Sequence, residues 1–131
     1  MRASVFTLAA ASLLAAAAAG GAQAQAAGDA AKGKALFTAQ CMVCHSTVSG
    51  QEINAPSLYG VVGRKAAADP GFTSYTPALK GSKLIWTAAN LDRFLAGPGQ
   101  LVPGTAMPIT LANPQDRHNV IAYLASLKKG K

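Results

Sequence analysis

Two cysteines and a histidine lie within five consecutive positions of the sequence. Cys41 and Cys44 are the only cysteines of the 131-residue chain, and His45 follows the second one directly. A zinc site would be short of ligands, because His118 is the only other histidine and stands at no zinc-finger spacing. A redox disulfide of this spacing is typical of an α/β domain with a strand before the cysteines, whereas a helical pattern precedes Cys41. Both interpretations therefore fit the surroundings poorly.

The order Cys-x-x-Cys-His is instead the attachment sequence of a c-type haem. Each thiol can add to one vinyl group on adjacent pyrrole rings, and two intervening residues allow one helical turn to present both sulfurs to one haem edge. His45, the next residue, then faces the iron from the same side. We therefore predict one haem c per chain, bound covalently through Cys41 and Cys44, with His45 as an axial iron ligand.

The second axial ligand is sought among the three methionines. Met1 belongs to an N-terminal leader, and Met42 lies inside the attachment loop, too close to reach the opposite haem face. Met107 lies in the segment 103–108, where proline and glycine predict a loop. A lone methionine can simply fill a gap in a core, but this setting favours an iron ligand. His118 lies in a polar run, and we expect a surface residue there.

The first 24 residues are typical of a secretory signal peptide. Arg2 is followed by an apolar run over 5–19, which is shorter than the ~20 residues of a transmembrane helix. Small residues precede Ala24 and Ala26, so we expect cleavage after one of them, export to the periplasm and a mature domain over 27–131.

Size and charge exclude several classes of protein. One small domain remains after the leader, which excludes a multidomain enzyme, a polytopic membrane protein and a repeat array. The net charge of +7 comes from scattered basic residues without interleaved aromatic residues, so we expect no nucleic-acid binding. A basic surface is compatible with transient contact at a membrane surface.

Capping signals predict three helices. Asp29 can cap a first helix that runs to about Gln40, Thr87 a short helix through Ala96, and Asn113 a last helix that begins with proline.

Further signals refine these helices. Gly97 and Pro98 are expected to end the second one. Gly33 would let the first and last helices cross closely, with Phe37 and Tyr123 at the crossing. Residues 46–86 show no clear regular structure. The last helix is expected to turn four apolar residues inward: Val120, Ile121, Leu124 and Leu127.

The ordered set of motifs resembles the class I cytochromes c over residues 28–127. The matching segments are GDAAKGKALF at 28–37, NAPSLYG at 54–60, GRK at 63–65, GFTSYTPAL at 71–79, PGTAM at 103–107 and IAYL at 121–124. The resemblance implies an all-α cytochrome c fold, in which three main helices and long loops wrap around one covalently attached haem.

The resemblance also implies roles for individual residues. Met107 matches the distal ligand of the iron, and Pro56 matches the proline whose carbonyl accepts the second ring N–H of His45. Four further residues match positions that hydrogen-bond the haem propionates: Arg64, Tyr75, Trp86 and Thr105.

Iron held by histidine and methionine has no open position for a substrate, so we expect an electron carrier and not an enzyme. The resemblance implies a membrane cytochrome bc complex as electron donor and a terminal oxidase or photosynthetic reaction centre as acceptor. Nothing in the sequence demands an oligomer, so we expect a monomer. A dedicated electron-accepting subunit of a periplasmic dehydrogenase is an alternative. A small haem peroxidase or gas sensor with Met107 displaced, and a haem-free disulfide domain, are further ones.

The chain departs from the family at the expected docking face. Relatives often place lysines around the exposed haem edge, where this chain carries Gln40, Gly99, Gln100 and Ala106. We therefore expect a less charged docking face, and an electron exchange with the partner that depends weakly on salt.

Overall fold

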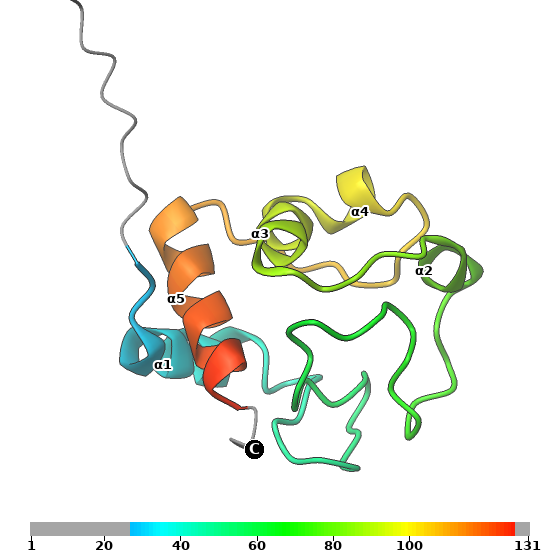
Figure 1. Ribbon diagram of the computed structural model, residues 1–131, viewed down its shortest axis with the longest axis horizontal. Helices are drawn as coiled ribbons and strands as arrows, with labels where there is room; N and C mark the ends of the chain where they lie inside the picture. Colours follow the sequence, from blue (N-terminus) through cyan, green and yellow to red (C-terminus); the bar gives the residue numbers. More distant parts are fainter. Residues whose placement is uncertain (1–26, 128–131) are drawn as a thin grey trace, which may run out of the picture.

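The structure is a computed structural model that describes residues 27–127. Five helices form within this range, and the only extended pairing there is an isolated antiparallel bridge between Lys65 and Ile85. The helices are α1 (Ala30–Gln40), α2 (Pro77–Gly81), α3 (Ala88–Ala96), α4 (Pro98–Leu101) and α5 (Pro114–Ser126). The expected all-α class with three main helices is confirmed, since α1, α3 and α5 are the long ones (Figure 1).

The predicted leader over 1–24, with its cleavage positions, lies outside the described residues. Within the described part of the chain, no helix has the length and apolarity needed to cross a membrane.

The predicted caps are present at all three main helices. Asp29 Oδ1 accepts a hydrogen bond from the N–H of Ala31 at 2.9 Å, at the start of α1. Thr87 Oγ1 accepts one from the third residue of α3 at 3.1 Å, and Asn113 Oδ1 accepts one from the second residue of α5 at 2.8 Å. Side-chain oxygens thus satisfy N–H groups that have no partner inside the helix, which sets where each helix begins.

Two predictions about regular structure were incomplete. Pro98 follows the end of α3 as predicted. It is also the first residue of α4, a position that suits proline. The segment 46–86 is not wholly irregular, because it contains α2, where Thr76 Oγ1 accepts a hydrogen bond from the N–H of Leu79 at 3.2 Å. Helices of four and five residues are too short to carry a periodic hydrophobic pattern.

The predicted close crossing of the first and last helices is confirmed. A methyl group on Gly33 would lie closer than 3.0 Å to the backbone carbonyl carbon and oxygen of Asn119, in the middle of α5. The ring centroids of Phe37 and Tyr123 are 5.5 Å apart beside this point. Figure 1 shows α1 and α5 crossing at one end of the molecule, away from α2. This crossing anchors the start of the segment that carries the cysteines.

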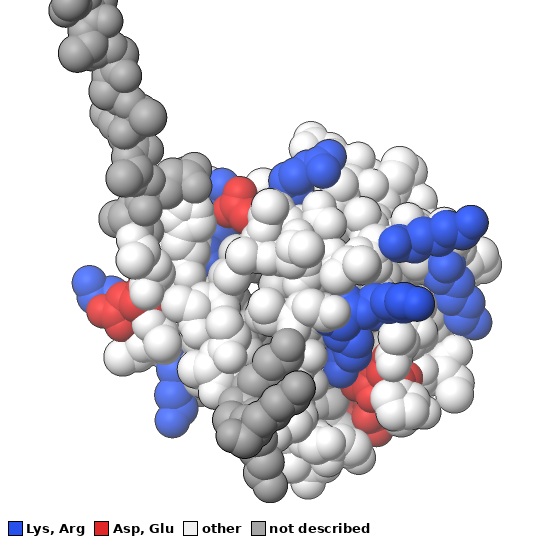
Figure 2. Space-filling model, in the orientation of Figure 1, with Lys and Arg blue, Asp and Glu red and all other residues white. Residues whose placement is uncertain are grey.

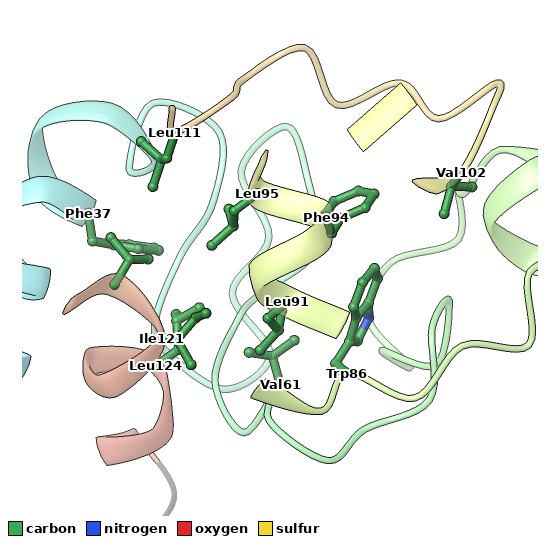
Figure 3. Close-up of a cluster of buried hydrophobic side chains, with 11 residues drawn as sticks. Phe37, Val61, Trp86, Leu91, Phe94, Leu95, Val102, Leu111, Ile121 and Leu124 are labelled. Atoms are coloured by element: carbon green, nitrogen blue, oxygen red, sulfur yellow. The ribbon is translucent and has the colours of Figure 1, made fainter. Parts of the chain in front are cut away.

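The hydrophobic core extends from the α1–α5 crossing to the far side of α3. Phe37 and Val120 are almost fully buried at the crossing, and Val120, Ile121 and Leu124 turn inward from α5 as predicted. Leu127 is partly buried against the same core. Figure 3 shows the other end of the core, where the rings of Trp86 and Phe94 pack together with centroids 4.9 Å apart.

The bridge next to Trp86 holds two distant parts of the long loop together. The N–H of Trp86 donates to the carbonyl of Arg64 at 2.8 Å, and the N–H of Gly63 donates to the carbonyl of Trp86 at 2.8 Å. A further bond joins the N–H of Ala66 to the carbonyl of Leu84 at 2.8 Å. Arg64 and Trp86 are therefore fixed side by side although more than twenty positions separate them.

Candidate functional site

A cavity of about 680 Å³ lies within the described chain, a size within the range of cofactor pockets. Its wall brings together all of the residues that the sequence predicted for the site: Cys41, Cys44, His45, Pro56, Arg64, Tyr75, Trp86, Thr105 and Met107. In the view of Figure 1, the loops that follow α1 lie below, and the segment between α4 and α5 lies above them. The cavity thus collects side chains that are far apart in the sequence.

The attachment segment continues directly from the end of α1. The N–H groups of Cys41 and Met42 both donate to the carbonyl of Phe37, at 2.8 and 3.0 Å. The N–H groups of Cys44 and His45 in turn donate to the carbonyl of Cys41, at 3.1 and 2.9 Å. This compact turn brings both thiols and the imidazole to the cavity wall. No disulfide joins the two cysteines, and burial raises the pKa of the Cys41 thiol.

The His45 ring is held by the backbone of Pro56. Its Nδ1 lies 2.8 Å from the Pro56 carbonyl oxygen, and since a carbonyl can only accept, Nδ1 carries the hydrogen. The other ring nitrogen, Nε2, then has a free lone pair in the neutral ring. Burial lowers the pKa of His45, and this outweighs the opposite effect of the Pro56 hydrogen bond. The neutral imidazole with a fixed orientation is the form that binds a metal.

Met107 lies half-buried in the loop that the prolines predicted. The N–H of Thr105 donates to the carbonyl of Val102 at 3.0 Å, and Gly104 has a φ of +92°, which an L-residue rarely adopts. The N–H of Met107 then approaches Thr105 Oγ1 at 3.4 Å. This turn places the thioether of Met107 and the side chain of Thr105 on the same cavity wall.

His118 does not line the cavity. Its Nε2 lies 3.7 Å from a carboxylate oxygen of Asp92, and its side chain is only 17% exposed. His118 is therefore partly buried and not fully at the surface as expected, because the packing of α5 against α3 covers part of the ring. No group of three or more histidines, cysteines or acidic residues gathers into a metal site in the described part of the chain.

Arg64 and Tyr75 form a polar corner of the cavity. The Arg64 guanidinium donates to the carbonyl of Ser57 at 2.8 Å and to that of Tyr59 at 3.2 Å. The Tyr75 hydroxyl accepts a hydrogen bond from the N–H of Asp69 at 3.2 Å. Burial raises the pKa of Tyr75, so its hydroxyl remains protonated at neutral pH. Two groups that can donate to carboxylates thus stand next to each other.

Asp69 belongs to this corner and was missed by the sequence reasoning. Its side chain is only 6% exposed and its carboxylate lies 3.6 Å from the Arg64 guanidinium. Asp69 is the one charged residue between Lys65 and Lys80, next to three alanines. A single acidic residue in an otherwise uncharged segment is the signal that could have marked Asp69 as a functional residue.

The residues around the cavity fit a covalently attached haem. Thiols and a neutral imidazole lie on one segment, a thioether lies on another, and hydrogen-bond donors form one corner. Much of the remaining wall is apolar and comes from the core: Phe37, Leu91, Phe94, Val120 and Leu124. Figure 3 shows Leu91 and Phe94 on α3, with Leu124 on the neighbouring α5. An apolar wall with a few convergent polar groups is the usual surrounding of a large cofactor.

Comparison with known proteins supports this interpretation. The cytochrome c family profile matches residues 30–128 of the chain. A cytochrome c2 from Rhodomicrobium vannielii is 46% identical over 107 residues, which are 80% of this chain and 84% of the relative. A cytochrome c2 from Rhodopila globiformis is 41% identical over 102 residues, 77% of this chain and 95% of the relative.

Solved structures agree with the sequence comparisons. Cytochrome cH from Methylobacterium extorquens superposes with a TM-score of 0.69 at 40% identity, over 76% of this chain and 99% of that protein. Ferricytochrome c2 from Rhodopseudomonas palustris gives a TM-score of 0.67 at 42% identity, again over 76% and 99%. The chain therefore belongs to the cytochrome c family, whose members are electron carriers with one covalently attached haem c.

Proposed function

We propose that this cytochrome c is an exported one-electron carrier with histidine and methionine as the axial ligands of its iron. Cys41 and Cys44 would form the two thioether bonds, and His45 and Met107 would bind the iron. One observation supports the proposal: a single cavity wall contains Cys41, Cys44, His45 and Met107. Because Nδ1 of His45 is hydrogen-bonded to Pro56, its Nε2 has the free lone pair. The leader over 1–24, cleaved after Ala24 or Ala26, would direct the mature domain 27–131 to the periplasm.

The haem, when bound, supplies an iron that alternates between the ferrous and ferric states. The chain determines how readily it does so. The hydrogen bond from His45 Nδ1–H to the Pro56 carbonyl fixes the ring and raises the donor strength of Nε2. The thioether of Met107 favours ferrous iron compared with a second nitrogen ligand, which raises the reduction potential. If His45 and Met107 both bind the iron, they would leave no position on it for a substrate.

The polar corner would bind the carboxylate side of the haem. Arg64 keeps free N–H donors after its bonds to two backbone carbonyls, because a guanidinium has five. Trp86, which is 7% exposed, has an indole N–H that can only donate, and Thr105 adds a hydroxyl. Arg64 would offset negative charge of the propionates, and Tyr75, Trp86 and Thr105 would help to orient them, while the apolar wall excludes water.

The partners would be large redox complexes at the membrane. We propose a membrane cytochrome bc complex as donor and a terminal oxidase or photosynthetic reaction centre as acceptor. The exchange would use brief contacts of a monomer. Co-purification with the subunits of a periplasmic dehydrogenase would instead identify this chain as a dedicated subunit of that enzyme.

Replacement of Met107 by alanine in the haem-loaded protein tests the axial ligand. We expect the methionine-to-iron charge-transfer band to disappear from the ferric spectrum and the midpoint potential to fall. Met42→Ala is the matched control, because Met42 is 47% exposed and does not line the cavity. An unchanged spectrum and potential in Met107→Ala would refute the proposed ligand set, whatever the control does.

A further inference from the structure

Asp69 is a buried acidic residue at the polar corner of the cavity. Its Oδ1 accepts a hydrogen bond from the N–H of Gly71 at 3.3 Å, which ties the carboxylate to its own loop. Its Oδ2 receives no hydrogen bond from the described residues. A buried carboxylate without a full set of donors is costly, so a nearby positive charge is needed to keep it there. Arg64, 3.6 Å away, supplies that charge.

The backbone of Asp69 orients the hydroxyl of Tyr75. Since the N–H of Asp69 donates to the Tyr75 oxygen at 3.2 Å, one lone pair of that oxygen is occupied. The hydroxyl hydrogen is therefore not used in this bond and remains free to donate. Because Tyr75 belongs to the cavity wall, a carboxylate bound in the cavity is a natural acceptor for its hydroxyl.

The side chain of Asp69 orients Arg64. Carbonyls of Ser57 and Tyr59 accept from the two terminal nitrogens of the guanidinium, and the Asp69 carboxylate lies beside one of them. The two carbonyl acceptors and the carboxylate come from two separate segments of the long loop. The guanidinium is thus held from the loop side, while its remaining N–H groups are available to the cavity.

We propose that Asp69 is a positioning residue that directs Arg64 and Tyr75 toward the haem carboxylates, and that its negative charge lowers the reduction potential of the iron. This rests on the proposed function, because it requires a haem whose carboxylates lie at the polar corner. Ferric haem carries one more positive charge than ferrous haem. A fixed negative charge nearby therefore stabilises the ferric state, and it also offsets part of the Arg64 charge.

Asp69→Asn in the haem-loaded protein separates the charge from the geometry. The amide oxygen can still accept from Gly71, and the backbone N–H of residue 69 can still donate to Tyr75. We expect the equilibrium constant for reduction to rise by up to about tenfold, which for one electron is about 59 mV in the midpoint potential. Because the residue is buried, the rise should persist at high ionic strength.

Asp116→Asn is the matched control, because it removes the same charge from the first turn of α5, outside the cavity wall. Its midpoint potential should stay close to that of the parent protein. Asp69→Glu retains the charge and should also stay close to the parent. Should Asp69→Asn fail to fold, Asp69→Ser provides a second neutral side chain that can accept from Gly71, with the same expected rise.

The outcomes distinguish this role from the proposed function. If Asp69→Asn shows a normal charge-transfer band and the same midpoint potential as Asp116→Asn, the role of Asp69 is overturned and the proposed ligand set is unaffected. A potential that falls in Asp69→Asn would also overturn it. Failure of the ligand set itself would instead be seen in Met107→Ala, which does not involve Asp69.

Discussion

Gly33→Ala should destabilise the protein strongly even though alanine is the better helix former. The new methyl group would meet the carbonyl carbon and oxygen of Asn119 at less than 3.0 Å, a separation that real side chains essentially never show. Both atoms belong to the backbone in the middle of α5, so neither can rotate away. The helices would have to separate by on the order of 1 Å, in an interior that is packed without spare room.

The size of the effect follows from two opposing contributions. Alanine in place of glycine inside α1 stabilises a helix by about 1 kcal/mol. Against this, overpacking costs about 1–3 kcal/mol or more, and separation of the helices loosens the Phe37–Tyr123 contact, whose ring centroids are now 5.5 Å apart. Such an aromatic pair contributes about 1 kcal/mol beyond its buried area. We expect a net loss of about 1–3 kcal/mol in the free energy of unfolding.

Denaturant unfolding of the haem-loaded protein, followed by far-ultraviolet circular dichroism, measures this loss as a lower transition midpoint. Gly99→Ala is the control, because Gly99 lies in α4 and a methyl group there meets nothing within 4 Å. It should be neutral or stabilise by up to about 1 kcal/mol. If Gly33→Ala is as stable as the parent protein, the two helices can adapt to the extra methyl group. The close crossing would then not explain why glycine occupies this position.

Two further outcomes follow from the surface and from the contact between α3 and α5. Val43, Ile53 and Ile109 belong to the cavity wall yet are 71%, 55% and 40% exposed, so the rim is largely apolar. Electron exchange with a partner should change less than about threefold between low and physiological ionic strength, and a steep fall in stopped-flow rate would contradict an uncharged docking face. Arg117→Met should lower the unfolding free energy by about 2 kcal/mol, because Arg117 Nε donates to Asp92 at 2.7 Å and the side chain also donates to two backbone carbonyls. Thermal unfolding with no drop in midpoint would show that this ion pair is dispensable.

The charge distribution shows why the salt dependence is expected to be weak. Figure 2 shows basic side chains gathered mainly toward the side of the molecule where α2 lies. The exposed lysines of this region are Lys65, Lys80 and Lys83. The positions where relatives often carry lysines, Gln40 and Ala106 among them, are exposed and uncharged in this chain. Lys80 and Lys83 thus carry their positive charge away from the cavity wall, whereas Lys65 lines it.

Local sequence signals were sufficient for several features. The helix starts depend on single capping side chains that contact N–H groups two or three residues later, so Asp29, Thr87 and Asn113 marked them correctly. The close crossing at Gly33 was predictable because a residue without a side chain on an otherwise apolar helix face permits close approach. The spacing of the cysteines and His45 indicated haem chemistry because covalent attachment depends on neighbours in the chain.

Other features required the tertiary structure. The partial burial of His118 depends on its contact with Asp92, which belongs to a different helix. The role of Asp69 depends on Arg64, which precedes it in the sequence, and on Tyr75, which follows it. The folded loop brings all three residues together.

Patterns within short stretches of the chain were thus enough to predict the type of haem attachment, the class of fold and the ends of the main helices. The folded structure was needed to identify the acceptors that hold Arg64, the donor to the Tyr75 hydroxyl oxygen and the carboxylate buried beside them. The difference lies in the range of the interactions. Caps, turns and thioether attachment act between neighbours in the chain, whereas burial and ion pairing depend on the position of residues that only folding brings together.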